Sequence, residues 1–134
     1  FAPDENMSLS RSDISILAQA KAANFCGQYI VLRKYGKPLE AITKMYLAGG
    51  FANYLETKNA AKIGFIPDFS SERVVKAGNA SLEGATIMLM SEKMRGVAES
   101  LVGNIEHVEL ETTPDFFDLF VEGCQFKPMP NIFV

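Results

Sequence analysis

The amino acids from Lys44 to Phe65 read KMYLAGGFANYLETKNAAKIGF. The apolar run Met45–Ala48 predicts a short buried strand, and the pair Gly49-Gly50 follows it directly. Glycine adopts backbone angles that are closed to other residues, and it leaves room beside the main chain. Because a helix is expected after the pair, the backbone N–H groups of the turn form fixed donors that suit a nucleotide. The same pattern fits a plain tight connection, so these residues alone leave both interpretations open.

A second stretch has the same order of elements. Residues Arg73–Ala77 predict a strand, Gly78-Asn79 follows it, and Ala80–Met90 predicts a helix that contains the small pair Gly84-Ala85. Two such turns in one small domain can face each other across a single ligand. The sequence therefore predicts an α/β half-domain with two glycine turns that are able to hold a small molecule.

A long helix precedes both stretches. Ser10 can cap its start, with Asp13 at the third position, and the pattern predicts a helix over Arg11–Tyr35 that ends at Gly36. Lys21 lies off the helical stripe of small and apolar residues. On spacing alone a solvated lysine is the first interpretation of this residue, and a ligand contact is the alternative.

The remaining elements are expected to be short. Local signals predict a helical turn at Pro38–Ile42, a helix at Thr57–Ile63, a loop at Asp68–Glu72, a helix at Ser91–Asn104, a strand at His107–Glu111 and a final helix that starts at Thr113-Pro114-Asp115. The strand rests on alternating polar and apolar residues, a pattern that turns Val108 and Leu110 inward and leaves His107 at the surface.

Composition narrows the classes of function. The 134 residues suit one domain, and 48% apolar residues can fill a core. A net charge of -3 with 13 scattered Lys and Arg residues predicts no nucleic-acid partner. No apolar run reaches the roughly 20 residues of a membrane span. No signal peptide is recognisable, so a soluble, cytoplasmic protein with no membrane partner is expected. The first residue is Phe1 and not Met, which suits a piece of a longer polypeptide.

No pattern of catalytic or metal-binding residues is recognisable. Cys26 and Cys124 lie far apart and the chain has 1 His, so the sequence predicts neither a zinc site nor an iron–sulfur cluster in this segment. Both thiols fit small buried hydrophobes, with a disulfide as the alternative. The chain also lacks a Ser-His-Asp order, HExxH, a GxxxxGK[ST] loop and GxGxxG. We therefore expect no catalytic residue and no metal ligand in this chain.

Three blocks carry a resemblance when they are taken together. They are LAGGFANYLETKNAAKIGFIPD (47–68), AGNASLEGA (77–85) and VELETTPDFFDLFVE (108–122). They resemble the C-terminal ATPase region of the corrinoid reductive activases, ferredoxin-like activators that reduce the cobalt of corrinoid methyl-carrier proteins. These activases belong to the ASKHA superfamily of acetate kinase, sugar kinases, heat-shock chaperones and actin.

The resemblance implies a fold and its organisation. The fold is an α/β half-domain of the actin-like (ribonuclease H-like) type, in which a mixed sheet has flanking helices. A linker or edge strand is expected at 1–9, the adenosine-binding lobe of an ASKHA-type ATPase domain at 10–126, and a C-terminal tail at 127–134.

The resemblance also implies a cofactor and the residues that hold it. The cofactor is ATP with Mg²⁺, and its adenosine end would lie on seven residues: Gly49 and Gly50 give backbone access to base and ribose, Phe51 and Asn53 line the base pocket, Gly78 and Asn79 shape the opposite wall, and Lys21 contacts the ribose. The superfamily's phosphate-binding loops, first connecting motif and catalytic acid have no counterpart in this sequence. They are expected in an upstream lobe that shares the ATP, and an iron–sulfur cluster is expected in another part of the full-length protein.

For the whole protein the resemblance implies ATP-dependent electron transfer from the iron–sulfur cluster to the Co(II) corrinoid of a methyltransferase system. The partners would be the corrinoid methyl-carrier protein and the chain's own upstream ATPase lobe. Two alternatives stay open. One is a nucleotide-independent docking module for the corrinoid protein, which would bind through the helix Asp115–Val121 and the strand His107–Glu111. The other is a lobe of a sugar or acetate-type kinase, because fold alone does not choose among these functions.

Overall fold

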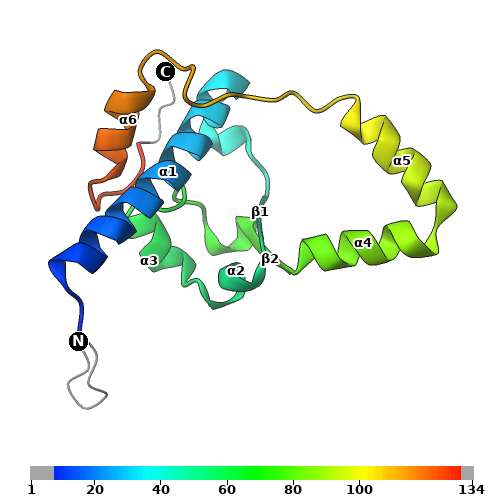
Figure 1. Ribbon diagram of the computed structural model, residues 1–134, viewed down its shortest axis with the longest axis horizontal. Coiled ribbons are helices and arrows are strands. Elements are labelled where there is room, and N and C mark those ends of the chain that lie inside the picture. The colour runs from blue at the N-terminus through cyan, green and yellow to red at the C-terminus, as the bar shows by residue number, and fades with distance from the viewer. Residues whose placement is uncertain (1–7, 131–134) are drawn as a thin grey trace. The chain divides into compact units, whose positions relative to one another are not determined.

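The structure, a computed structural model, describes residues 8–130 (Figure 1). Of the two terminal segments predicted above, residues 1–7 and 131–134 lie outside the described residues. The elements follow in this order: α1 (Arg11–Tyr35), the 3-10 helix η2 (Leu39–Ala41), β1 (Met45–Ala48), α2 (Gly50–Tyr54), α3 (Thr57–Lys62), the 3-10 helix η3 (Ser71–Arg73), β2 (Val74–Gly78), α4 (Ala80–Met90), α5 (Glu92–Val102) and α6 (Phe116–Gly123).

The described residues form two compact units. The described parts of the first unit are 8–41, 57–68 and 109–130, and those of the second are 42–56 and 69–108. The first unit therefore holds α1, α3 and α6, and the second holds both strands with α2, α4 and α5. The part of the chain that the structure describes is mostly helical, with one small parallel sheet of two strands.

The long helix α1 begins and ends where the sequence predicts. The Ser10 side chain accepts a hydrogen bond from the Asp13 backbone N–H at 3.1 Å, and the Asp13 carboxylate accepts one from the Ser10 N–H at 2.8 Å. This reciprocal pair satisfies two donors that a helix start otherwise leaves unpaired. The helix stops at Gly36, whose φ of 67° is left-handed and favours glycine.

Close packing of α1 against α6 forms the core of the first unit (Figure 1). A Cβ at Gly123 would lie 3.0 Å from Ala22 Cα and 3.0 Å from Phe25 Cδ1, so only a glycine lets the two helices approach this closely. The buried apolar residues of this unit are Ala22, Phe25, Cys26, Ile30, Leu39, Ala60, Ala61, Ile66, Leu119 and Met129.

An ion pair joins the last turn of α1 to the start of α6. Arg33 donates from both guanidinium nitrogens to the Asp115 carboxylate, at 2.6 and 2.9 Å. Asp115 is the residue before α6, but its side chain makes no capping hydrogen bond to that helix. The bidentate geometry is the strong form of this pair, and it explains why the carboxylate is turned away from the helix it precedes.

The two strands of the second unit are parallel neighbours. Met45 pairs with Val74, and Leu47 pairs with Lys76. Along β1 the side chains alternate between half-buried and exposed, with Tyr46 63% exposed. The prediction of a buried strand is therefore wrong, because a two-stranded sheet with one covered face leaves every second side chain at the surface.

The prediction of a strand at His107–Glu111 is also wrong. These residues have no regular hydrogen-bonded structure, and the described residues contain no mixed sheet, since β1 and β2 pair only with each other. The alternation of polar and apolar residues in this stretch has a different cause. Val108 and Leu110 are half-buried and His107 is exposed, and Leu110 lies beside α1, 3.7 Å from where a Cβ on Gly27 would be. One-sided burial thus occurs without a neighbouring strand.

Two short elements were not predicted. The five-residue helix α2 starts within the glycine pair, before the helix expected at Thr57–Ile63, and η3 overlaps the end of the expected loop and extends to Arg73. The helix α3 ends one residue earlier than predicted, the strand β2 is shifted by one residue at both ends, and α4 has the predicted bounds. The short helix matters most, because it begins at one of the predicted site residues.

Candidate functional site

The two glycine turns lie side by side at one end of the small sheet. Parallel strands bring their carboxyl ends to the same edge, so the residues that follow β1 and β2 become neighbours. The register shifts after Leu47, and Ala48 then pairs with Gly78. The Gly49 N–H donates to the Gly78 carbonyl oxygen at 2.7 Å. The turns are therefore hydrogen-bonded neighbours, and the predicted place of Gly78 in the wall of a ligand pocket stays a prediction.

Backbone angles require glycine at both turns. Gly49 has φ 94° and ψ 159°, a region that essentially only glycine occupies, and Gly78 has a left-handed φ of 63°. Gly50 is different, because it lies in α2 and is not among the glycines with positive φ. A Cβ built at any of these three positions would meet nothing within 4 Å. Backbone strain thus accounts for Gly49 and Gly78, while the described residues give Gly50 neither strain nor crowding.

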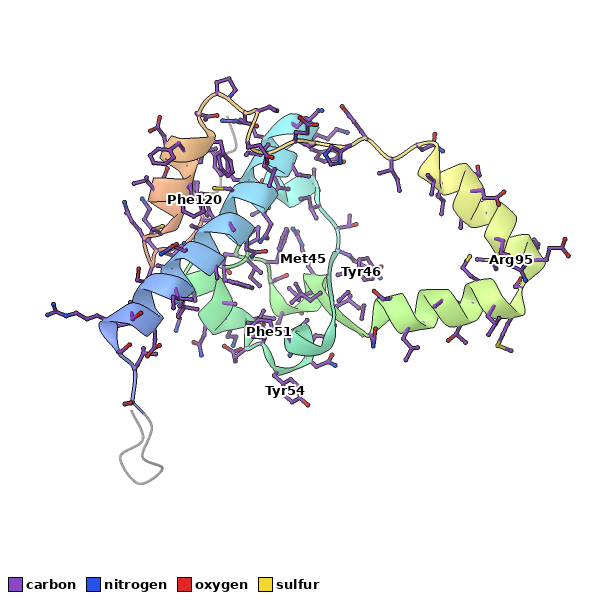
Figure 2. All side chains as sticks on the ribbon, viewed as in Figure 1. Met45, Tyr46, Phe51, Tyr54, Arg95 and Phe120 are labelled. Carbon is purple, nitrogen blue, oxygen red and sulfur yellow. The ribbon has the colours of Figure 1, made fainter. Side chains whose placement is uncertain are left out.

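Two exposed aromatic side chains follow the first turn, both in α2. Phe51 is 70% exposed and Tyr54 is 91% exposed, and Tyr54 projects outward from α2 (Figure 2). Between them Ala52 is buried, so α2 packs on the rest of its unit through one small side chain. The Asn53 side chain is exposed. The predicted base pocket at Phe51 and Asn53 stays a prediction.

Asn79 at the second turn caps the helix that follows it. Its side-chain oxygen accepts a hydrogen bond from the Leu82 backbone N–H at 3.1 Å. This bond satisfies one of the unpaired donors at the start of α4, as expected for an asparagine in this position. The side chain of Asn79 therefore stabilises the helix, and its predicted contact with a ligand remains a prediction.

Lys21 belongs to the first unit, whereas the other six predicted site residues belong to the second. Its exposed fraction is 1%, so the interpretation as a solvated lysine is wrong. The ammonium group donates to the carbonyl oxygen of Gly123, the last residue of α6, at 2.8 Å and to that of Gln125, just after the helix, at 2.7 Å. It also lies 5.2 Å from the Phe25 ring centre. Burial lowers the pKa of Lys21, because the charged form loses hydration. The predicted ribose contact stays a prediction.

Both cysteines are free thiols. Cys26 is fully buried, as the sequence predicted, and Cys124 is half-buried. Burial raises the pKa of the Cys26 thiol above its usual value. Among residues 8–130 no group of three or more His, Cys, Asp or Glu side chains is arranged to bind a metal ion. Over the same residues, no helix combines the length and the apolar character needed to cross a membrane.

One side chain of the site was missed by sequence reasoning. Lys76 of β2 donates to the Asn53 carbonyl oxygen at 3.0 Å and to the Leu55 carbonyl oxygen at 2.8 Å. These two carbonyls lie at the end of α2, where a helix leaves its acceptors unpaired. The contact could not be foreseen, because the sequence gave no separate signal for α2.

Comparison with known proteins identifies the family. A family model described as the C-terminal domain of RACo, the ASKHA domain, matches residues 2–132. This chain belongs to the RACo C-terminal family. The resemblance to corrinoid reductive activases drawn from the three sequence blocks is therefore confirmed.

Two relatives of this RACo-family chain bear names that fit the family. The corrinoid activation enzyme RamQ from Eubacterium limosum is 28% identical over 118 residues, which are 88% of this chain and 20% of that protein. A solved structure of a reductive activator for corrinoid, iron-sulfur protein has a TM-score of 0.81 at 35% identity, and the match covers 90% of this chain and 19% of the other. The chain thus spans about a fifth of the length of the relatives it matches.

Proposed function

We propose that this chain is the adenosine-holding lobe in the ATPase domain of a longer, ATP-dependent reductive activator. In the complete protein, nucleotide-driven closure would promote electron transfer from an iron–sulfur cluster to the Co(II) corrinoid of a methyl-carrier protein. Support comes from the RACo C-terminal family, from relatives named as corrinoid activators, and from relatives that are about five times longer than this chain. The other four-fifths would supply the partner lobe, complete the mixed sheet and carry the iron–sulfur module.

The observation that carries the proposal is the open space at Gly50. In the interior of a helix alanine is favoured over glycine by about 1 kcal/mol, and Gly50 is the first residue of α2. Here the backbone is helical and a Cβ would touch none of the described residues, so the protein's own packing gives no reason for the glycine. A ligand lying against the main chain gives such a reason. A nucleoside that lies with its flat face against the main chain would use this open space.

The proposed roles follow the geometry of the turns. Gly49 and Gly50 would let base and ribose lie against the backbone, with Phe51 and Asn53 beside the base. Gly78 and Asn79 would border the same surface from the neighbouring strand. Lys21 belongs to the first unit, and its ammonium is buried on two backbone carbonyl oxygens, so we propose no role for it at the turns.

ATP would supply the free energy of phosphate hydrolysis, and its phosphates and Mg²⁺ would bind to the other lobe. The contribution of this chain is differential affinity. A nucleotide that contacts the glycine turns better in one arrangement of the lobes shifts the protein toward that arrangement, by no more than the difference in binding free energy.

The test is nucleotide binding by the full-length protein. A fluorescent adenine nucleotide is titrated against the wild type and against Gly50→Val, whose branched side chain would occupy the open space. Since valine forms helix better than glycine, α2 itself is not weakened by the change. We expect the Kd to rise at least about tenfold, which corresponds to roughly 1.4 kcal/mol.

Gly96→Val is the matched control for this titration. Gly96 is also a helical glycine with nothing within 4 Å of a Cβ, but it lies in α5. We expect its Kd to equal that of the wild type. Unchanged affinity of folded Gly50→Val would overturn the adenosine site. It would then favour the docking alternative, now limited to α6, where Phe117 is 74% exposed.

A further inference from the structure

The helix α2 is too short to hold its own position. It has five residues, Gly50–Tyr54, and isolated helices of this length do not persist in water. Its direction must therefore be fixed by contacts with the rest of the second unit. Because α2 starts at Gly50, any residue that fixes this helix also fixes the backbone of the first glycine turn.

One strand provides the contacts at both ends of α2. Before the helix, the Gly49 N–H donates to the Gly78 carbonyl oxygen of β2. After the helix, Lys76 of the same strand donates to the carbonyl oxygens of Asn53 and Leu55. The two anchoring residues are only two positions apart in β2, so α2 is held against this strand at its beginning and at its end.

The irregular register of the sheet makes this double anchorage possible. Leu47 pairs with Lys76, but the next residue, Ala48, pairs with Gly78, so Ala77 is an extra residue in β2. A bulge of this kind brings Gly78 level with the end of β1 and re-aims the neighbouring side chains. The extra residue Ala77 thus lies between the two residues that contact α2 and its turn: Lys76, which bonds to the end of α2, and Gly78, which bonds to Gly49.

The charge of Lys76 suits the atoms that it contacts. The end of a helix carries a partial negative charge on its unpaired carbonyl groups, and a lysine there is stabilising. Lys76 is exposed, so its ammonium keeps its hydration while it donates two hydrogen bonds. Because Lys76 is exposed, its two hydrogen bonds to backbone carbonyls at the end of α2 are better explained by a role in orienting this helix than by a role in the core.

We propose that Lys76 is a positioning residue, which holds α2 so that the Gly49-Gly50 turn is preformed for an adenine nucleotide. The inference rests on the proposed function, because it assigns the turn to that ligand. Lys76 does not touch the nucleotide. It lowers the cost of binding by keeping the turn in the geometry that the ligand requires.

The test compares three variants of the full-length protein. Lys76→Met keeps the apolar stem and removes both hydrogen bonds, Lys76→Arg keeps a cation that can reach both carbonyls, and Lys93→Met removes an exposed lysine from α5 as a matched control. The measurements are the Kd for a fluorescent adenine nucleotide, the melting temperature without nucleotide, and amide hydrogen exchange of residues 49–55 without nucleotide.

We expect Lys76→Met to raise the Kd about fivefold to tenfold and to speed exchange at residues 49–55, with a melting temperature equal to that of Lys93→Met. Lys76→Arg should restore the Kd to within about twofold of the wild type. A wild-type Kd in Lys76→Met would overturn the inference. So would a loss of affinity that follows a lower melting temperature and that arginine does not rescue, because that would be loss of stability alone.

Failure of the proposed function gives a separate result. If the wild-type protein binds no adenine nucleotide, then the adenosine site and the positioning role fall together. Faster exchange at residues 49–55 in Lys76→Met would then show that Lys76 holds α2 for another reason. If the wild type binds and Lys76→Met binds equally well, only the positioning role is wrong.

Discussion

Gly64 is the glycine with the least room for a side chain in the described part of the first unit. Its φ is +72°, and a Cβ on it would collide with the Lys127 carbonyl oxygen and lie 3.1 Å from the Lys21 ammonium nitrogen. The same ammonium holds the carbonyls of Gly123 and Gln125. This single glycine therefore lets the turn after α3 approach the segment after α6, around a buried lysine.

Replacement of Gly64 should be costly for two separate reasons. Gly64→Ala would combine the strain of a left-handed backbone, about 1–2 kcal/mol, with a collision against a carbonyl oxygen that cannot easily move. We expect a loss of at least about 3 kcal/mol in the free energy of unfolding. Gly36→Ala is the control, because it has a φ of +67° but only a contact at 3.9 Å. Equal losses, measured by urea unfolding, would contradict the crowding argument.

Single residues show which sequence signals are reliable. The capping pair of Ser10 and Asp13 was predicted and is present, because both partners lie within one turn of the chain. Lys21 was predicted to be solvated and is buried. Its acceptors are more than 100 positions away in the sequence, so helical spacing carries no information about them. Local chemistry could be predicted, and the tertiary contacts of the same helix could not.

At the scale of elements, the contact between Arg33 and Asp115 ties the end of α1 to the start of α6. Hydrogen bonding to the Arg33 guanidinium holds the pKa of Asp115 below its usual value of 3.8. The folded state therefore releases the proton of Asp115 more readily than the unfolded state. The stability from this pair is complete above about pH 3.8 and is lost as the pH falls through the lowered pKa.

The expected result is a pH-dependent difference between two proteins. Asp115→Asn should lower the melting temperature at pH 7, and the difference from wild type should vanish as the pH falls below 3.8. The pKa of Asp13 is also lowered, through its hydrogen bonds with Ser10, but that carboxyl titrates in both proteins and cancels. Asp118→Asn, at an exposed position in α6, is the matched control. A difference that persists below this pH range would argue against the pair.

Elements were predictable where their signals are local. The helices α1 and α4 have the predicted bounds, since caps and glycines mark their ends. The strand predicted at His107–Glu111 is absent, because a strand also needs a partner and alternation cannot supply one. Two strand–turn–helix units were predicted, with turns that can face each other across a ligand, but the direct hydrogen bond between the turns depends on the bulge at Ala77. The sequence therefore predicted the two turns and not how they meet.

At the scale of the whole molecule, burial is unevenly distributed. The helix α1 has five buried residues, whereas α4 and α5 have none. Hydrogen exchange follows burial and contact density, since exposed helices open locally at low cost. We therefore expect amides in the middle of α1 to exchange at least about tenfold more slowly than those of α4 and α5 in this 134-residue chain. Mass-spectrometric exchange measures this difference, and equal protection in the three helices would contradict it.

The passage of the chain between the two units constrains how the protein can change over generations. The chain enters the second unit after residue 41, leaves it after 56, enters again after 68 and leaves again after 108. A single recombination point between residues 41 and 108 would therefore give a protein in which both units are mixtures of two parents. Exchange of one complete unit would need four recombination points, one at each passage between the units. Gly49 and Gly78 lie in different segments of the second unit, on either side of α3. A recombination point between the two segments would separate Gly49 from Gly78. We therefore expect the two turns to be inherited together, and to diverge by substitution and not by exchange of segments.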